Sequence, residues 1–546
     1  MTVTTSAPPE ADDEVESLPE PADAPASPAP TLRERLLGYR PSDVLWGWLG
    51  PLIITAIGGF LRFWNLNKPP RLDFDEAYYV KQAYSMMKWG WERRWIGDEG
   101  GAKATNLWDQ NKIDQIWIMS GPDQADYVVH PPLGKWMIAV GEWLIGPTYR
   151  YGWRFSVALC GTISILMLAR IARRMFGSTL LGCTAGLLLA VDGMHFTQSR
   201  TGLLDLFVMF WALAGFGFIL IDRDRTRAKL ASLVEAGDRP KWYLPWQWWR
   251  PYHLLAAVCF GLATGVKWSG AFFLAVFLIA SVLWDLGARR ATGERHWFGS
   301  ILPSGIYGAI TAIPVALAAY LATWAGWFAS HDAWDRQWGA NNPTGYGAGI
   351  LPNALRGLWH YHRDVYKFHI GVTDDHPWES NPWSWMVMLR PTLFWLDGGA
   401  ACPPGMAGPC TQAVHNLGTP AIWWAATLGL FVLFFCWAFR RDWRAGAILA
   451  GIAAGYLPWF NYQDRTIFTF YAIAFTPWVI LAVVYCLGLV LGPRDADPDR
   501  RFAGAVAAGG FVVLCVAMFG YFYPIYAGDT IPQSVWDSRT WLPSWR

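Results

Sequence analysis

The segment PLGKWMIAVGEWLIG, Pro132 to Gly146, decides the topology of this chain. It is apolar, but it is short for a transmembrane helix and carries Lys135 and Glu142. If it crossed a membrane, every later segment would be inverted. Outside it, apolar segments of about 17 to 25 residues, long enough to span bilayer hydrocarbon, begin near residues 43, 153, 178, 201, 252, 269, 300, 420, 445, 467 and 502.

Basic residues indicate how these segments are oriented, because short cytoplasmic loops accumulate Lys and Arg. The charges around the first segment are indecisive, since Arg33, Arg35 and Arg40 precede it while Arg62, Lys68 and Arg71 end or follow it. Five later clusters fall on the cytoplasmic side if the Pro132 segment does not span: Arg170/Arg173/Arg174, the loop Arg223 to Arg250, Arg289/Arg290/Arg295, Arg440/Arg441/Arg444 and Arg494/Arg500/Arg501. We therefore predict eleven spans, a cytoplasmic N-terminus and an external C-terminus, with residues 132 to 146 as a surface-lying or re-entrant helix.

The composition supports a membrane protein. Of 546 residues, 53% are hydrophobic and only 16% are charged, which is too apolar for a soluble chain of this length. The 37 Trp suit bilayer interfaces, where one end of the ring is dry and the other wet. The predicted fold class is an all-α polytopic membrane protein with two large extracytoplasmic loops.

The chain divides into five predicted parts. Residues 1 to 40 are rich in Pro, Ala and Glu and are expected to form a disordered cytoplasmic tail, passive or regulatory. No cleavable signal peptide is expected. The other parts are a transmembrane catalytic module (41 to 328, with a first external loop at about 65 to 152), a large external loop (329 to 418), C-terminal transmembrane helices (419 to 526) and an external tail (527 to 546).

The best candidate for a chemical centre lies in RLDFDEAYYVKQAYSMMKWGW, residues 71 to 91. Asp75 and Glu76 are adjacent carboxylates, and adjacent positions on a helix do not share a face, so the two can have different roles. The residues after them have the spacing of an amphipathic interfacial helix. At the N-terminus of that helix the dipole favours ionised carboxylates, and an ionised Asp can accept a proton.

The predicted topology brings further polar residues to the same outer side. Charges at membrane depth are costly and usually face a cavity or a partner, so the set predicts a polar active site roofed by loops. The alternative is that each is an ordinary residue at a helix end. The set comprises Asp75, Glu76, the HPPLGK stretch from His130 to Lys135, Arg154, Ser199 and Arg200, Asp205, Lys267 and the NYQDR run ending at Arg465.

The loop from 329 to 418 contains His331, His360, His362, His369, His376 and several Asp residues. Their spacing matches no established metal motif, and CxxC and HExxH are absent from the sequence, so no metal site is predicted. Cys402 and Cys410 are the only cysteines outside the predicted spans, in an oxidising compartment, and we expect them to form a disulfide. GxxxxGK[ST] and GxGxxG are also absent, so a donor already in the membrane is expected.

Five stretches occur in an order that resembles the protein O-mannosyltransferase family of polyprenyl-phosphate-dependent GT-C glycosyltransferases. They are LDFDEAYY, VVHPPLGK, YGWRFSVALCGT, QSRTGLLDLFVMF and GLATGVKWSGAFF, and the similarity covers roughly residues 40 to 290. The resemblance implies eleven spans with a catalytic first external loop. Eukaryotic members carry a β-trefoil MIR domain in the large external loop, and the loop here is too short for it. The resemblance therefore points to a bacterial, actinobacterial member.

The resemblance also implies a reaction, the transfer of mannose from polyprenyl phosphate mannose to Ser or Thr hydroxyls of exported proteins. A carboxylate must take the hydroxyl proton in the transition state, and Asp75 matches the family's catalytic aspartate. Phosphate is a good leaving group, so a single inverting displacement needs no second acid. No cofactor is expected to be required, although a divalent ion held by Asp75 and Glu76 is an alternative.

The remaining residues receive supporting roles. Glu76 is expected to position the acceptor or the active site, and Arg154 matches the family arginine near the donor phosphate. Further candidates for the phosphate are Arg200, Lys267 and Arg465. Pocket-shaping candidates are His130, Pro131, Pro132, Lys135 and Asp205; the prolines could serve as a turn alone, and an ion pair with Arg200 could explain Asp205.

Two other functions are alternatives. A related GT-C enzyme that modifies a lipid or cell-wall glycan, of the aminoarabinose or arabinose type, needs the same donor cavity. A transporter is disfavoured because we find no internal repeat. The expected location is the plasma membrane, and the expected partners are polyprenyl phosphate mannose, a secreted protein with Ser or Thr, the bilayer and the protein export channel, with no nucleic acid.

Overall fold

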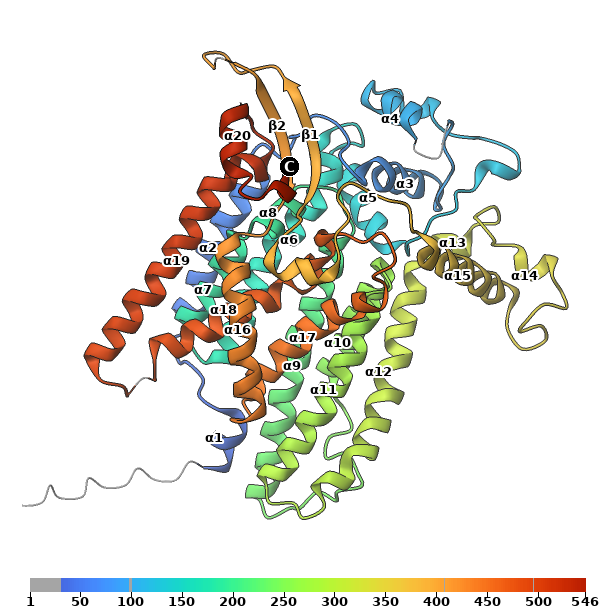
Figure 1. Ribbon diagram of the computed structural model, residues 1–546. Helices are drawn as coiled ribbons and strands as arrows, with labels where there is room; N and C mark the ends of the chain where they lie inside the picture. The colour runs from blue at the N-terminus through green and yellow to red at the C-terminus, as the bar shows by residue number, and fades with distance from the viewer. Residues whose placement is uncertain (1–30, 98–100, 407, 494) are drawn as a thin grey trace, which may run out of the picture.

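The computed structural model describes residues 31–97, 101–406, 408–493 and 495–546, and most of these are helical. The long helices run side by side as one bundle (Figure 1). Short helices, loops and a small sheet gather at one end of the bundle, at the top of Figure 1, and the short helix α1 lies at the other. The part of the predicted tail formed by residues 1 to 30 lies outside the described residues.

Each of the eleven predicted segments contains a helix. Within the described ranges, eight helical segments are long and apolar enough to cross a membrane: α2 (Val44–Phe63), α6 (Arg150–Phe176), α9 (Asp205–Glu235), α11 (Gly270–Ala291), Trp297–Thr323 with α12 (Ile301–Thr323), α16 (Pro420–Ala438), Thr469–Leu491 with α18 (Thr476–Leu491), and α19 (Pro498–Ala527). Three shorter helices occupy the other segments: α7 (Thr179–Ala190), α10 (Pro251–Val266) and α17 (Trp443–Tyr456). The prediction of a polytopic helical membrane fold is confirmed, and the number of spans stays a prediction.

The segment that decides the topology forms α5 (Leu133–Ile145), which is not among the candidate spans. Its 13 residues extend about 20 Å at 1.5 Å per residue, less than the roughly 30 Å of bilayer hydrocarbon. α5 packs against α6 and against α3 (Glu76–Trp89) at the upper end of the bundle in Figure 1. This placement supports a helix that does not span.

Residues 31 to 40 differ from the predicted disordered tail. They contain α1 (Leu32–Leu37), whose N-terminus is capped reciprocally by Thr31 and Glu34. Leu36 of α1 is buried against Leu230 and Ala288, on α9 and α11. The Pro-rich composition of residues 1 to 40 as a whole gave no indication of this short helix.

The helix after the two carboxylates is present, but it is not a simple interfacial helix. In α3 the polar side chains of Lys81, Gln82 and Ser85 are buried together with the apolar ones. Lys81 donates to Thr105 of α4 (Ala102–Asp109) at 3.0 Å, and Gln82 donates to Asp126 at 3.3 Å. The first external loop therefore covers the face that the sequence pattern assigned to water.

A small antiparallel sheet, absent from the sequence prediction, lies at the same end. Its order is β1 (Thr392–Ala400), β2 (Cys410–Asn416) and β3 (Thr530–Pro532), so the C-terminal tail supplies its third strand. Cys402 and Cys410 form the predicted disulfide. The other elements at this end are α8 (Gly193–Gln198), α13 (Ala325–Ala329), α14 (Trp338–Asn341), α15 (Asn353–Gly371) and α20 (Gln533–Arg539).

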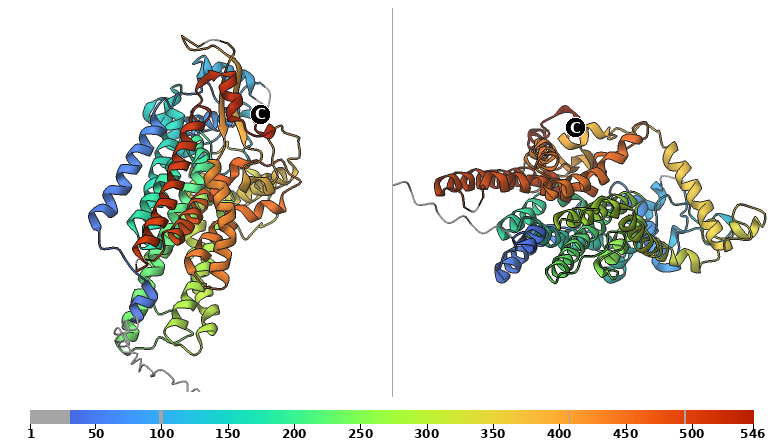
Figure 2. Two further views of the ribbon diagram at one scale, coloured as in Figure 1. Left: turned by 60° about the vertical axis from the view of Figure 1, so that its left-hand side comes forward. Right: turned by 90° about the horizontal axis from the view of Figure 1, so that it is seen from below.

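The segment with α13 to α15 projects from one edge of the bundle, whereas α19 lies at the opposite edge (Figure 2). α15 is tied back to the first external loop, because the Tyr361 hydroxyl donates to the carbonyl of Val128 at 2.9 Å and accepts from its N–H at 3.0 Å. The two loops that were predicted to be external are therefore joined by direct hydrogen bonds at the same end of the bundle.

Candidate active site

Phe74, the residue before Asp75, fixes the entry of the chain into α3. Its φ of 47° lies in the left-handed region, which costs about 1 to 3 kcal/mol for a residue with a side chain. The Phe74 ring packs against Phe394 of β1 and Phe470, with centroids 5.1 and 5.5 Å apart. These contacts hold the strained residue in place and set the direction of the following carboxylates.

Asp75 occupies the N-cap position of α3, but its side chain makes no cap hydrogen bond. Instead it accepts a hydrogen bond from the Tyr79 hydroxyl at 3.2 Å. Asp75 lines a cavity of about 680 Å³ together with Tyr78, Trp95, Asp126 and other residues of the external loops. Burial raises the pKa of Asp75 to about 6, so near neutral pH its carboxylate is ionised and more basic than an exposed aspartate.

Glu76 points away from that cavity. It is fully buried and accepts hydrogen bonds of 2.7 Å from both Nε and Nη2 of Arg154, one of 2.6 Å from the Gly202 N–H and one of 3.1 Å from the Asp73 N–H. Arg154 is also fully buried. Its other guanidinium N–H groups donate to the backbone carbonyls of Leu66, Pro69 and Arg71.

The expected contact between Arg154 and a donor phosphate does not fit this geometry. The guanidinium is committed to Glu76 and to three carbonyls, and it lines neither of the two cavities near Asp75. Arg154 instead fastens the start of α3 to α6 through Glu76. Glu76 therefore has a structural role at the start of α3, and it lines neither cavity.

Arg200 is likewise turned away from the site. Its guanidinium donates to the carbonyls of Leu61, Arg62, Trp64 and Asn65, at the C-terminal end of α2. A cation at a helix C-terminus stabilises the helix dipole and the unpaired carbonyls. The expected phosphate role of Arg200 thus does not fit its contacts. The suggested ion pair between Asp205 and Arg200 is also absent from the described residues, because Asp205 pairs with a different cation.

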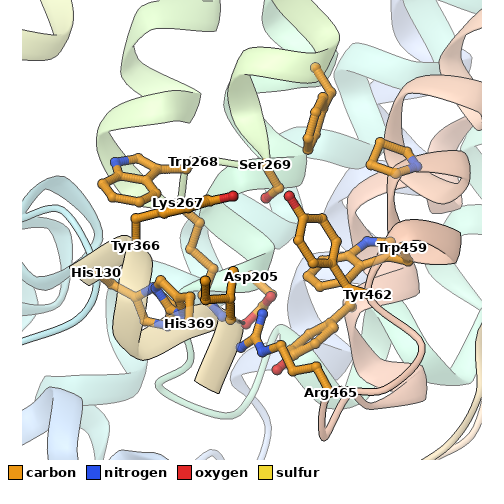
Figure 3. Close-up of a pocket in the computed structure, with 14 residues that line it drawn as sticks. His130, Asp205, Lys267, Trp268, Ser269, Tyr366, His369, Trp459, Tyr462 and Arg465 are labelled. Carbon is orange, nitrogen blue, oxygen red and sulfur yellow. Dashed lines mark hydrogen bonds and ion pairs between the residues drawn. The ribbon is translucent and has the colours of Figure 1, made fainter. Parts of the chain in front are cut away.

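That partner is Lys267, whose Nζ lies 2.7 Å from Oδ2 of Asp205. Both residues line a second cavity, of about 230 Å³. Arg465 enters the same cavity from the loop after α17, and its Nε has no hydrogen-bond partner among the described residues. Figure 3 shows Arg465 extending toward Asp205 and Lys267, with the rings of Tyr462 and Trp459 beside it. Two of the four predicted phosphate ligands therefore meet here.

His130 joins the two cavities, because it lines both. Its ring stacks on His369 of α15 at 5.2 Å, and burial keeps the pKa of His130 well below its ordinary value, so the imidazole is neutral. Pro131 and Pro132 lead into α5, with Pro132 at its N-cap position. Lys135 lines neither cavity; it is buried and donates to Glu92 at 2.6 Å and to the His130 carbonyl at 3.0 Å.

One group of side chains in the described residues has the composition of a metal site. Ligand atoms of Asp335, His360 and Asp364 lie within 4.8 Å of one another. His360 Nδ1 is 2.9 Å from Asp335 and its ring stacks on Trp338 at 4.3 Å. These residues line neither cavity near Asp75.

Three residues of the site were not predicted from the sequence: Tyr79, His369 and Tyr471. Tyr79 is four residues after Asp75, a helical spacing that brings side chains together and could have identified it. His369 was noted only as one of several histidines in the external loop, and Tyr471 lies inside a segment interpreted as a span. His369 and Tyr471 line the same cavity as Asp205 and Lys267. This proximity depends on tertiary packing, which leaves no local signal in the sequence.

Comparisons with known proteins identify the family of this chain. Residues 129–237 match the family model described as dolichyl-phosphate-mannose-protein mannosyltransferase, and residues 354–545 match the C-terminal four-span region of protein O-mannosyltransferase. The polyprenol-phosphate-mannose–protein mannosyltransferase of Mycolicibacterium smegmatis is 37% identical over 95% of this chain and 96% of its own length. The chain belongs to the protein O-mannosyltransferase family.

Other relatives support the same assignment. The enzyme of that name from Mycobacterium tuberculosis is 36% identical over 93% of this chain and 94% of its own length. In the solved Pmt1–Pmt2 protein O-mannosyltransferase complex of S. cerevisiae bound to the sugar donor, one chain aligns with a TM-score of 0.69 at 14% identity, covering 94% of both chains. The fold is thus that of the GT-C membrane glycosyltransferases, and the chain is a membrane-bound protein mannosyltransferase.

Proposed function

We propose that this protein mannosyltransferase transfers mannose from polyprenyl phosphate mannose to Ser or Thr hydroxyls of exported proteins, with Asp75 as the general base. The observation that carries the proposal is the position of Asp75 in a large external cavity that shares His130 with a smaller cationic cavity. One cavity suits an acceptor and the other suits a phosphate-bearing donor. The base lies in the acceptor cavity.

The chemistry is a single displacement. The Asp75 carboxylate takes the proton of the acceptor hydroxyl as its oxygen bonds to C1 of mannose, and the bond from C1 to the phosphate oxygen breaks. Attack from the face opposite the phosphate inverts the configuration at C1. The products are the mannosylated side chain and polyprenyl phosphate.

The smaller cavity supplies the charge that the leaving phosphate needs. Lys267 is partly neutralised by Asp205, whereas Arg465 presents a planar donor fork that fits phosphate in two-point contact. Aromatic residues of the cavity, among them Trp268, Phe272 and Trp459, surround these cations with apolar surface. We assign the donor phosphate to Arg465 and Lys267, and we propose that no metal ion is required because these side chains provide the cations.

The larger cavity has room for a peptide segment. Its walls combine aromatic rings, including Tyr127, Trp334 and Phe368, with Asp126 and Arg94. Aromatic walls with a few polar groups bind an extended chain without requiring one sequence. A lipid or cell-wall glycan acceptor is the second candidate, because the cationic cavity would serve its donor equally well.

We further propose a plasma-membrane location with the N-terminus in the cytoplasm and the active site outside. The basic clusters from Arg170 to Arg444 support this orientation by the positive-inside rule. Acceptors would then meet the enzyme during export, and crosslinking to the export channel would test that association.

Membranes containing the enzyme, radiolabelled polyprenyl phosphate mannose and a secreted peptide rich in Ser and Thr provide the test. We expect label in the peptide, and none with Asp75→Asn. Label in a lipid or glycan other than the donor, with none in the peptide, would support the glycolipid candidate and contradict protein mannosylation. Loss of label after mild base treatment of the peptide would confirm an O-glycosidic linkage to Ser or Thr.

A further inference from the structure

A second basic cavity lies at the end of the bundle opposite the active site. It has a volume of about 580 Å³, and four arginines are among its lining residues: Arg40, Arg170, Arg173 and Arg174. Its walls are apolar residues of α6 and α9, including Met167, Ile171, Leu213 and Phe218. The cavity therefore combines positively charged side chains with an apolar surface of α6 and α9.

The length of α6 separates this cavity from the catalytic site. Arg154 contacts Glu76 near one end of α6, and Arg170 follows 16 residues later in the same helix. At 1.5 Å per residue the two arginines are about 24 Å apart along the helix axis, most of the roughly 30 Å thickness of bilayer hydrocarbon. One lipid phosphate cannot occupy both sites.

The arginines of this cavity outnumber the carboxylates around them. Asp224 accepts from Arg40 at 3.0 Å, from Arg174 at 2.6 Å and from Arg223 at 3.0 Å. Asp43 pairs with Arg173 at 2.8 Å. Two carboxylates thus face five guanidinium groups once Arg170 is included, which leaves an excess of three positive charges.

Arg170 itself is available to an anion from outside the protein. Its guanidinium carbon lies 3.8 Å from the centre of the Trp48 ring, and it donates to the Gly47 carbonyl. In the described part of the chain its contacts include no ion pair with a carboxylate. Trp48 is 47% exposed, so the stacked pair borders the bilayer.

We propose that this cavity binds an anionic phospholipid of the surrounding leaflet, with its phosphate between Arg170 and Arg174 and an acyl chain between α6 and α9. Guanidinium groups bind phosphate oxygens in pairs, and basic pockets between transmembrane helices are suited to anionic headgroups. A soluble phosphate ion could contact the arginines, but it would leave the apolar walls of the cavity without a binding partner. On the proposed topology this is the cytoplasmic leaflet, where anionic lipid is attracted by the same arginines that set the orientation.

The test measures lipid binding to the purified full-length protein by native mass spectrometry. Phosphatidylglycerol and phosphatidylcholine with identical acyl chains are compared, and we expect at least tenfold preference for phosphatidylglycerol. The double variant Arg170→Gln/Arg174→Gln should lose that preference. Arg440→Gln, which removes an exposed arginine outside the cavity, is the matched control and should retain it.

A second variant tests the groove without altering charge. Ala214 is partly exposed on the α9 wall, so Ala214→Phe should fill the space for an acyl chain and weaken phosphatidylglycerol binding several-fold. Both variants should retain mannosyl transfer, because none of the three residues lies at the active site. An unchanged lipid preference in both variants, or binding of polyprenyl phosphate but not of phosphatidylglycerol, would overturn the proposal.

Discussion

Arg154 and Glu76 form a buried two-point ion pair in which both guanidinium-to-carboxylate distances are 2.7 Å. Neither side chain is exposed to solvent. The pair links residues 78 positions apart and ties the start of α3 to α6. The position of Asp75, one residue before Glu76 in the chain, therefore depends on this ion pair.

Breaking the pair should unfold the site rather than only slow the reaction. Glu76→Ala or Arg154→Ala leaves an uncompensated buried charge, which costs about 3 to 5 kcal/mol. Thermal unfolding in detergent should show a clear loss of stability for both variants. Arg150→Ala, at the exposed start of the same helix, is the control. A variant at Arg154 with normal stability and weakened donor binding would restore the phosphate role expected from the sequence.

Asp75→Asn should retain the fold and donor binding while abolishing catalysis. The amide keeps the shape of the carboxylate but cannot take the hydroxyl proton, and loss of a general base costs on the order of 10²- to 10⁴-fold in rate. Transfer to peptide and binding of polyprenyl phosphate should be measured on the same preparation. Asp109→Asn, in α4 outside both cavities, should be as active as the unaltered enzyme. Near-normal turnover by Asp75→Asn would show that another group is the base.

The rate of transfer should fall in acid with a midpoint near the pKa of Asp75, about 6. Below that pH the carboxyl is protonated and cannot act as a base, so activity rises with pH and levels off above neutrality. Tyr79→Phe removes a hydrogen bond that lowers the pKa of Asp75, so the midpoint should move upward. Burial raises the pKa of Asp126 in the same cavity to about 7. The profile should therefore be repeated with Asp126→Asn, and an acid limb that disappears in this variant would assign the titration to Asp126.

Arg465→Ala should weaken binding of polyprenyl phosphate mannose by at least tenfold, because it removes the charged fork from the smaller cavity. Arg465→Lys keeps the charge but not the two-point geometry, so it should recover part of the affinity. Binding of labelled donor and of product polyprenyl phosphate should change in parallel. Arg390→Ala is the control, since Arg390 is exposed and lies outside this cavity. Equal donor affinity in Arg465→Ala and Arg390→Ala would contradict the assignment.

Removal of divalent metal should leave transfer unchanged within about twofold, because Lys267 and Arg465 supply the positive charge at the phosphate. Initial rates should be compared after EDTA treatment and after addition of Mg²⁺ or Mn²⁺. If the rate depends on metal, His360→Ala distinguishes an ion bound by Asp335, His360 and Asp364 from one bound by Asp75 and Glu76. A metal requirement that persists in His360→Ala would point to an ion at Asp75 and Glu76 and contradict the proposed mechanism.

The sequence predicted the helical segments because each is an unbroken apolar run, a signal that does not depend on tertiary structure. It also singled out Asp75, which lines the larger cavity, because a charged pair beside a span is costly unless it has a function. His130, Lys267 and Arg465 do reach cavities around Asp75, as the common outer level of their segments suggested.

Charge alone could not show which arginines are free. Arg154, Arg200 and Arg465 have the same side chain, and only the contacts separate them: an internal carboxylate, the carbonyls at the end of α2, and an open cavity. The sheet was also beyond prediction. β3 is three residues long and pairs with a strand more than one hundred positions earlier, so it has no local periodicity.

The strand β3 makes the order of synthesis matter to the enzyme. It pairs with β2, β2 pairs with β1, and Phe394 of β1 packs against the strained Phe74 beside the base. The indole of Trp545, one residue before the end of the chain, donates to the Met388 carbonyl at 2.8 Å. Both β3 and Trp545 follow α19 in the chain, so they are synthesised after the membrane helices of the described residues. A nascent copy therefore has its helices before the support beneath Asp75 is complete.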